Sequence, residues 1–397
     1  MSDDANPKEA PATHGPNGDL IEWAKSGTGL PRELMSTPGG FLWWYLDVVD
    51  ENGSGMVVIW SFGLPFLPGY IDACRRNRPQ LPANRPSLNV AVYRQGNPDF
   101  YLLKEFDGDD ADWNLRADGD DWRFGNSIIE STVDGNQRTL RLRLRLDVPH
   151  LDSRTDIDFV ASGPGIHRSG EVHDPSARSF VPDTRHNWTP LLCNQSASAT
   201  VDIGGEIRRL SGRVYHDRNG GFAPLHQLGI RHWSWGRIAL PQRELIYYVL
   251  DGRDDTTQTL LLTVDSAGCI RRLDGAALIR RGSQTNRGGL QWWSSMTVAV
   301  DGRPWLDIEH RDVVDSGPFY LRAILTATDQ RGRRSRGVAE FCEPDRIDRR
   351  RHRPLVRMRV AHPGDNNSMW LPLFCGPRRG RIRRMLRSLL PDTGGPS

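Results

Sequence analysis

Short apolar stretches separated by turn residues recur along most of this 397-residue chain. The first pair, FLWWYLDVVD (41–50) and MVVIWSFGL (56–64), is rich in aromatic and β-branched residues and flanks the turn-forming residues 51–55. Such a pair is typical of a β-hairpin. The run RTLRLRLRLDV (138–148) alternates Leu and Arg with a period of two, which indicates a strand with one buried and one solvated face.

Turn residues are frequent, with 40 glycines and 27 prolines, and strand-like runs continue through most of the chain. This pattern predicts an all-β protein, and the length suits two antiparallel β-barrel or sandwich domains better than one core. Helices are expected only at 381–390 and, as a short segment, at 70–77. The predicted parts are a flexible arm (1–30), an N-terminal β domain (31–221), a C-terminal β domain (222–376) and a basic tail (377–397).

The charge of the chain argues against a nucleic-acid partner, because the formal net charge is only +3. Five cysteines, an odd number without a CxxC spacing, favour a reducing compartment. The sequence contains neither a secretory leader nor a stretch of about 18 apolar residues, so a cytoplasmic protein is expected. It also lacks a P-loop, a GxGxxG after a strand, an HExxH and a GxSxG, so we expect neither a cofactor nor a metal.

Two short segments carry side chains suited to chemistry, His186-x-Trp188 and Tyr215-x-Asp217. On strands, the two members of each pair point to the same face, so neighbouring strands would gather all four on their inward faces. A carboxyl buried among aromatic groups can stay protonated near neutral pH and act as a general acid. Each pair also has a purely structural interpretation, as strand packing or as a strand end before a turn, and the residues alone leave both open.

Longer stretches carry a family resemblance. They include WWYLDVVDENGSGMVVIWSFGLPFLPGY (43–70), LNVAVY (88–93) and Pro318-Phe319-Tyr320. The strongest stretch is Gly212-x-x-Tyr215-x-Asp217-x-Asn219-x-Gly221, followed by Trp-Ser-Trp-Gly-Arg at 233–237. Together these stretches, which cover most of residues 40–375 in patches, resemble the carotenoid 1,2-hydratase (hydroxyneurosporene synthase) family.

The resemblance implies two lipocalin-like β domains, with the catalytic motifs in the first. It also implies cofactor-independent addition of water to the terminal 1,2 C=C bond of an acyclic carotenoid of the lycopene or neurosporene type, giving a tertiary 1-hydroxy carotenoid. Asp217 matches the proton donor of that family, and His186, Trp188 and Tyr215 match its other catalytic positions. Trp233, Trp235 and Arg237 are then expected in the substrate pocket, with a core or ion-pairing role as the plainer alternative.

Two features depart from the family pattern, His216 inside the Tyr-x-Asp motif and the acidic stretch 106–112. Neither touches the four matched positions, but the substrate stays open, because related lipocalin-like proteins perform other reactions on polyenes. The alternatives are a pericyclic (Diels–Alder-type) cyclase and a non-catalytic carrier of an apolar ligand. A carrier has no use for an acid inside an apolar cavity, where an unpaired carboxyl is costly.

The tail segment RRGRIRRMLRSLL (378–390) interleaves arginines with apolar residues at helical spacing. A basic amphipathic helix can lie on an anionic membrane surface, which would suit an enzyme that takes a polyene out of a bilayer. The alternative is a tail that is solvated or docked on the protein.

Overall fold

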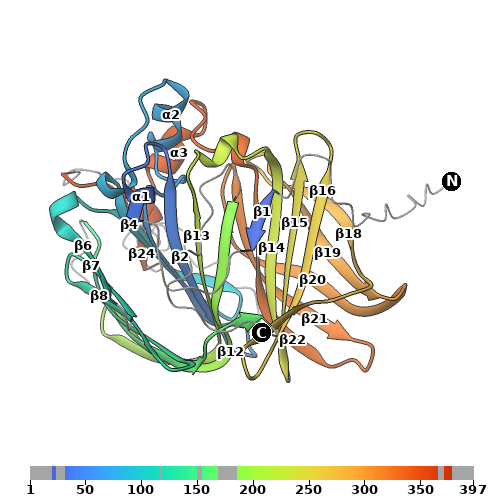
Figure 1. Ribbon diagram of the computed structural model, residues 1–397. Helices are drawn as coiled ribbons and strands as arrows, with labels where there is room; N and C mark the ends of the chain where they lie inside the picture. The colour runs from blue at the N-terminus through green and yellow to red at the C-terminus, as the bar shows by residue number, and fades with distance from the viewer. Residues whose placement is uncertain are drawn as a thin grey trace, which may run out of the picture.

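The computed structural model describes residues 20–23, 32–116, 119–149, 154–168, 186–364 and 371–377. Within these residues, the chain forms a 14-stranded sheet and a 10-stranded sheet, two curled sheets that lie side by side (Figure 1). The predicted all-β fold is confirmed. The described helices are short: α1 (Arg32–Met35), α2 (Tyr70–Arg75), α3 (Arg353–Arg357), α4 (Leu371–Phe374), and 3-10 turns at Pro82–Asn84, Gly108–Asp110, Leu225–Gln227 and Pro344–Arg346.

The first sheet is built mainly from the N-terminal half of the chain, and all but one of the pairings along its main path are antiparallel. Its strands, in spatial order, are β23 (Val360–Ala361), β5 (Asn97–Glu105), β4 (Pro86–Arg94), β3 (Gly55–Phe62), β2 (Phe41–Val49), β13 (Glu206–Gly221), β12 (His186–Ile203), β10 (Arg154–Pro164), β9 (Gln137–Asp147), β8 (Ser127–Asp134), β7 (Gly119–Phe124) and β6 (Ala111–Arg116). Outside this path, β1 (Ile21–Trp23) pairs with β12, and β24 (Gly376–Pro377) pairs with β5.

The second sheet is built mainly from the C-terminal half. Its strands, in spatial order, are β11 (His167–Arg168), β17 (Cys269–Arg272), β16 (Thr257–Asp265), β15 (Arg243–Gly252), β14 (Ile230–Leu240), β22 (Arg334–Cys342), β21 (Tyr320–Asp329), β20 (Arg303–Ser316), β19 (Gln291–Val300) and β18 (Ala276–Thr285).

Local sequence patterns explain the individual strands. In β9, the alternating leucines 140–146 are buried, while Arg141 and Arg143 are exposed, as the period of two predicts. The turn at 51–55 joins β2 to β3 in the predicted hairpin. The short helix expected at 70–77 is α2. The helix expected at 381–390 lies outside the described residues.

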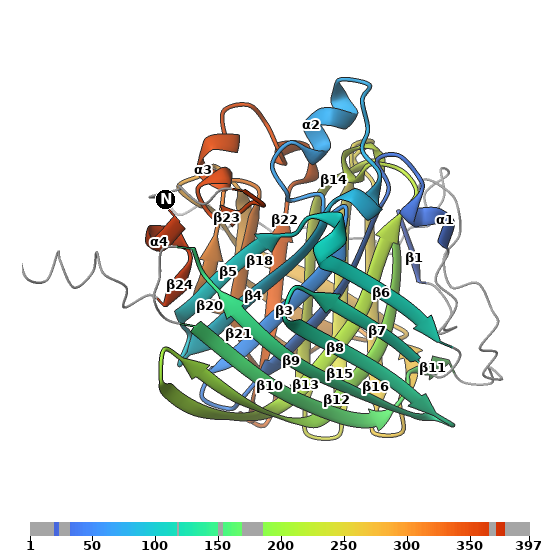
Figure 2. The ribbon, with the colours of Figure 1, turned by 90° about the vertical axis from the view of Figure 1, so that its left-hand side faces the viewer.

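The buried side chains form three cores. One lies inside the curl of the first sheet, where Trp122 of β7 packs against Trp44 and Trp60 of β2 and β3. Figure 2 shows β6–β10 crossing the strands β2–β5 that they cover. A second core fills the curl of the second sheet around Tyr247 and Phe341. The third lies between the two sheets.

The position of β2 between two cores explains why its sequence is almost entirely apolar. Trp44 points into the curl of its own sheet, while Trp43 and Tyr45 point toward the second sheet. Because both faces are covered, every residue of β2 is buried. The boundary predicted at residues 221/222 remains a prediction. The main parts of the two sheets fall on either side of it, but β23 and β24 return to the first sheet, and β11 joins the second.

Candidate active site

The two predicted motifs lie on neighbouring antiparallel strands, β12 and β13, with Trp188 opposite Asn219. Because side chains alternate along a strand, Tyr215, Asp217 and Asn219 share one face of β13. That face belongs to the core between the sheets, which also contains Trp188. We expected the four motif side chains on inward faces of the N-terminal domain. They lie instead on the outer side of the curled first sheet, where they face the second sheet.

Three neutral side chains donate hydrogen bonds to the Asp217 carboxylate. The Tyr215 hydroxyl and the Trp188 indole N–H donate to Oδ2, at 2.6 and 2.7 Å. The Asn219 amide donates to Oδ1 at 2.7 Å, and its own oxygen lies 3.0 Å from Nε2 of His186. The motif residues therefore form one continuous network, and among the described residues Asp217 has no cationic partner.

Burial decides the protonation state of this network. Asp217 is only 2% exposed, and desolvation raises the pKa of its carboxyl to about 7, although the donors Tyr215, Trp188 and Asn219 lower it. The charge of Glu340 also raises this pKa. Burial lowers the pKa of His186 to about 4, so its imidazole is neutral near pH 7. The site therefore holds a carboxyl that can carry a proton near neutral pH, where an exposed aspartate is ionised.

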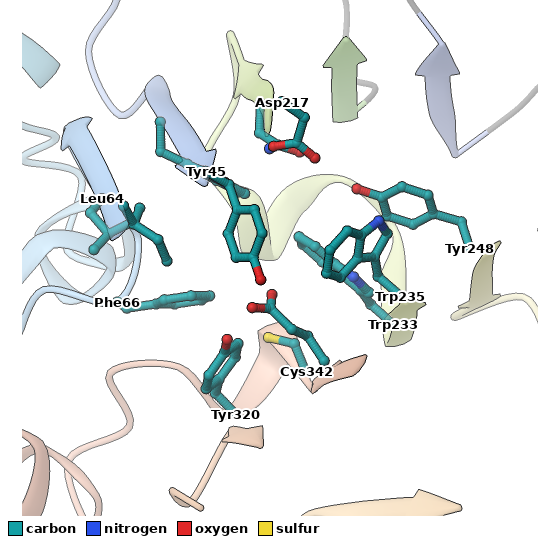
Figure 3. A pocket seen from close by; sticks show the side chains of 13 residues that line it. Tyr45, Leu64, Phe66, Asp217, Trp233, Trp235, Tyr248, Tyr320 and Cys342 are labelled. Atoms are coloured by element: carbon teal, nitrogen blue, oxygen red, sulfur yellow. The ribbon is translucent and has the colours of Figure 1, made fainter. Parts of the chain in front are cut away.

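Asp217 and Asn219 reach a cavity between the sheets that is otherwise mostly aromatic and apolar. Figure 3 shows Asp217 at one side and Tyr320 and Cys342 at the other, with the Tyr45 ring between them in this view. The ring centroids of Tyr45 and Trp235 lie 5.2 Å apart. The cavity is lined by Trp43, Tyr45, Ile59, Leu64, Phe66, Asp217, Asn219, Trp233, Trp235, Tyr248, Tyr320, Glu340 and Cys342.

A larger hollow adjoins this cavity, and its walls are mainly apolar. Four residues line both spaces: Ile59, Leu64, Phe66 and Tyr320. The hollow continues past Tyr101, Leu103 and Met358, and its volume is about 650 Å³. The acid therefore lines a small cavity of about 20 Å³ that shares a wall with this larger apolar hollow.

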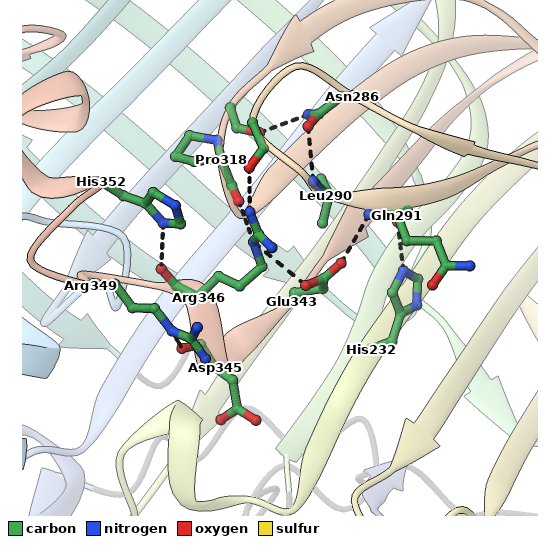
Figure 4. Close-up of polar contacts among 12 residues, drawn as sticks. His232, Asn286, Leu290, Gln291, Pro318, Glu343, Asp345, Arg346, Arg349 and His352 are labelled. Atoms are coloured by element: carbon green, nitrogen blue, oxygen red, sulfur yellow. Dashed lines mark hydrogen bonds and ion pairs between the residues drawn. The ribbon is translucent and has the colours of Figure 1, made fainter.

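Hydrogen bonds from two side chains hold the backbone of two segments that line this hollow, at 286–288 and 316–318 (Figure 4). Arg346 donates to the carbonyl of Pro318 at 2.7 Å and also to that of Gly288. Asn286 donates to the carbonyl of Gly317 at 2.8 Å. These hydrogen bonds connect the segment at 286–288 with the segment at 316–318.

Residues 58–368, most of the chain, match the family model described as carotenoid hydratase CrtC. The chain belongs to this family. The carotenoid hydratases are hydro-lyases, so the chain is an enzyme.

Two curated proteins are similar to this chain over much of its length. A "hydroxyneurosporene dehydrogenase" from Chlorobaculum tepidum is 26% identical over 379 residues, which cover 89% of this chain and 96% of the relative. An "acyclic carotenoid 1,2-hydratase" from Thiocapsa roseopersicina is 28% identical over 276 residues, 65% of this chain and 62% of the relative. The match thus spans less than two thirds of the Thiocapsa protein.

A solved structure supports the fold of the carotenoid hydratase. A putative AttH from Nitrosomonas europaea superposes with a TM-score of 0.53 at 16% identity, covering 84% of this chain and 99% of that chain. The lipocalin-like fold class predicted from the sequence is confirmed.

The structure separates the seven sequence-predicted site residues of this carotenoid hydratase into three groups. Asp217, Trp233 and Trp235 line the cavity. Trp188 and Tyr215 lie behind Asp217 and bind its carboxylate. The other two, His186 and Arg237, do not line the cavity.

The one hydrogen bond of His186 to a cavity residue, among the described residues, is with Asn219. Its ring packs against Trp43 and Trp233, at centroid distances of 5.6 and 5.1 Å. Arg237 shares a strand face with Trp235 but lies farther along β14, where its fully buried guanidinium pairs with Asp47 and Glu244. We expected Arg237 in the substrate pocket, and its position corresponds instead to the ion-pairing alternative.

Sequence reasoning named only three of the thirteen cavity residues, and those that it missed include Asn219, Tyr248 and Glu340. Asn219 continues the period of two that begins at Tyr215 and Asp217, and extending that pattern by two residues would have found it. Tyr248 and Glu340 come from β15 and β22 of the second sheet. No local pattern marks them, because only the packing of the two sheets brings them to Asp217.

No group of three or more His, Cys, Asp or Glu side chains in the described part of the chain could hold a metal ion. The five cysteines are free and buried. Among the described helices, none combines the length and the apolar character needed to cross a membrane.

Proposed function

We propose that the chain adds water across the terminal 1,2 C=C bond of an acyclic carotenoid of the lycopene or neurosporene type, giving a tertiary 1-hydroxy carotenoid. The observation that carries this proposal is Asp217, a buried carboxyl with a pKa near 7 at the wall of an aromatic cavity. Protonation of an isolated alkene needs an acid held against it in a site that excludes bulk water.

In the first step, Asp217 transfers its proton to C2 of the terminal isoprene unit, which leaves a tertiary cation at C1. The hydrogen bonds from Tyr215 and Trp188 then stabilise the aspartate that remains. The faces of Tyr45 and Trp235 stabilise the cation, as aromatic rings do for positive charge within about 6 Å of their centroids.

In the second step, water bonds to C1 and loses a proton. The overall change is the addition of one water molecule, so the atoms balance without an electron donor or acceptor. We therefore propose that the reaction is independent of a cofactor. The extended hollow next to the cavity suits the remainder of a long apolar chain, with Ile59, Leu64, Phe66 and Tyr320 at the junction.

The test is to incubate the purified protein with neurosporene and with lycopene and to analyse the products by mass spectrometry. A product heavier by one water, hydroxylated at C1, supports the proposal. A rearranged product of unchanged mass would point to the cyclase alternative, and a product lacking two hydrogens would point to dehydrogenation. Binding without any product would indicate a carrier.

A further inference from the structure

The proposed reaction needs a second group, which accepts the proton that water loses. His186 is the sequence-based candidate for this task, but it does not line the cavity, and its Nε2 is engaged by Asn219. The cavity wall contains one other carboxyl, that of Glu340. We propose that Glu340, oriented by Arg322, binds the attacking water and accepts its proton; this inference rests on the function proposed above.

Position supports this assignment first. Glu340 lies on β22 of the second sheet, where it pairs in register with Trp235 of β14. Asp217 lies on β13 of the first sheet. Both carboxyls line the same cavity, one from each sheet, so a terminal double bond that enters between the sheets lies between an acid and a base.

The surroundings of the two carboxyls differ in the way that their opposite tasks require. Asp217 accepts hydrogen bonds only from neutral groups among the described residues, whereas Glu340 accepts one from the Arg322 guanidinium at 2.9 Å. Burial raises the pKa of both carboxyls, but the charge and hydrogen bond of Arg322 lower the pKa of Glu340, whereas no cation does so for Asp217 among the described residues. Paired carboxyls in unlike settings are the usual basis for dividing acid and base roles.

Arg322 is itself held in place. It is 1% exposed, and it also donates to the Tyr93 hydroxyl of the first sheet at 2.9 Å. Its guanidinium carbon lies 5.4 Å from the Tyr320 ring centroid. One oxygen of Glu340, Oε1, is thus fixed by Arg322, and the carboxylate has limited freedom to turn away from the cavity. Arg322 is a positioning residue in this scheme.

Over one complete cycle, the protein neither gains nor loses a proton. The oxygen of water forms a bond to C1, and the O–H bond that breaks passes its proton to Glu340. Asp217 has then lost a proton and Glu340 has gained one, and transfer through solvent water resets both groups. The titratable or charged groups that face Glu340 are Arg322 and Tyr320 (β21), Tyr45 and Asp47 (β2), Asp217 (β13), Tyr93 (β4), Tyr248 (β15) and Cys342 (β22).

The test compares Glu340→Gln with Glu244→Gln. Glu244 is a matched control, because it is also buried and paired with an arginine, Arg237, but does not line the cavity. Each variant is incubated with neurosporene in heavy water, and two quantities are measured: the hydrated product, and deuterium in the recovered substrate. Thermal unfolding establishes that each variant is folded.

We expect Glu340→Gln to lose hydration by about 100-fold or more, the usual effect of losing a general base. Deuterium should still enter its recovered substrate, because Asp217 protonates the alkene and, without water capture, the cation loses a proton again. The acidic limb of the pH profile of kcat/KM should also disappear. Glu244→Gln should keep hydration and show little exchange.

Hydration by Glu340→Gln within about threefold of the control would overturn the assignment, since a general base contributes far more. Loss of exchange together with hydration would also overturn it. If Glu340→Gln does not fold, Glu340→Asp is used in its place. A loss of hydration that is larger than the loss of exchange would support the assignment. Unchanged hydration would contradict it. If the wild-type protein neither exchanges nor hydrates any acyclic carotenoid, the proposed function itself fails, and this inference falls with it.

Discussion

Replacement of Asp217 by asparagine removes the acidic proton that the carboxyl could transfer, and it changes the shape of the site very little. The amide oxygen of the new side chain can accept the hydrogen bonds that Tyr215 and Trp188 now donate to Oδ2. Its NH2 group then faces Asn219, whose own amide can turn to present its oxygen. The turned Asn219 then donates to Nε2 of His186, whose neutral ring carries its proton on Nδ1 in the variant. With these changes the network is kept, so we expect the Asp217→Asn variant to fold and to retain the cavity.

The expected loss of activity follows from the missing acid. Positioned acids contribute rate factors of about 10² to 10⁴, equivalent to about 3 to 5 kcal/mol of barrier. In the wild-type protein, the pKa near 7 further predicts that kcat/KM falls about tenfold per pH unit above neutrality, as Asp217 loses its proton. The variant should lack this alkaline limb, because an amide does not titrate.

The same pKa makes a prediction about stability. The folded pKa of Asp217 is about 7, above the value of 3.8 for an unperturbed aspartate. Proton binding therefore stabilises the folded wild type fully below about pH 4, and this contribution, about 4 kcal/mol, is lost as the pH rises to 7. Relative to wild type, Asp217→Asn should gain stability across this range.

The assay is steady-state hydration of neurosporene from pH 5 to 9, combined with urea unfolding at pH 4 and pH 7. Hydration by the variant at the wild-type rate would refute the role of Asp217 as proton donor. A stability difference between the two proteins that does not change with pH would refute its raised pKa.

Three further predictions address the surroundings of the site. Tyr215→Phe removes a donor that lowers the pKa of Asp217, so the alkaline limb of the kcat/KM profile should move to higher pH; an unmoved limb would contradict the hydrogen-bond argument. Met358→Trp narrows the part of the hollow that lies away from the acid. It should raise KM for the full-length carotenoid and leave KM unchanged for a short analogue with the same end group. An equal effect on both substrates would exclude the hollow as the binding site of the carotenoid chain. Deletion of residues 378–397, which lie outside the described residues, should reduce flotation with anionic vesicles, whereas equal flotation of both forms would rule out the tail as an anchor.

Local patterns in the sequence predicted the parts of this site that depend on one strand or on one strand pair. The period of two on β13 correctly places Tyr215 and Asp217 on one face, and β12 lies beside it, as the proposed pairing of the motifs requires. The direction of that face could not be read from the pattern, because both sides of the central strands are buried. Alternation distinguishes two faces only when one of them meets water.

The contributions of the second sheet lie beyond sequence reasoning for a different reason. Glu340 and Arg322 sit in strands that read as ordinary buried segments, and their neighbours across the cavity are more than one hundred residues earlier in the chain. Arg237 illustrates the opposite error. It shares a face with Trp233 and Trp235, yet it lies beyond the end of the cavity, against Asp47. Periodicity gives the face of a residue but not its distance from a site.

The most direct test of acid-catalysed hydration is a single incubation in water labelled with ¹⁸O. The purified wild-type protein is mixed with neurosporene, and the product is analysed by mass spectrometry beside that of Asp217→Asn. The account predicts a 1-hydroxy carotenoid that carries ¹⁸O from the solvent in the wild-type reaction, and at least about 100-fold less of it with the variant. A product without solvent oxygen, or equal labelling by the variant, would contradict it.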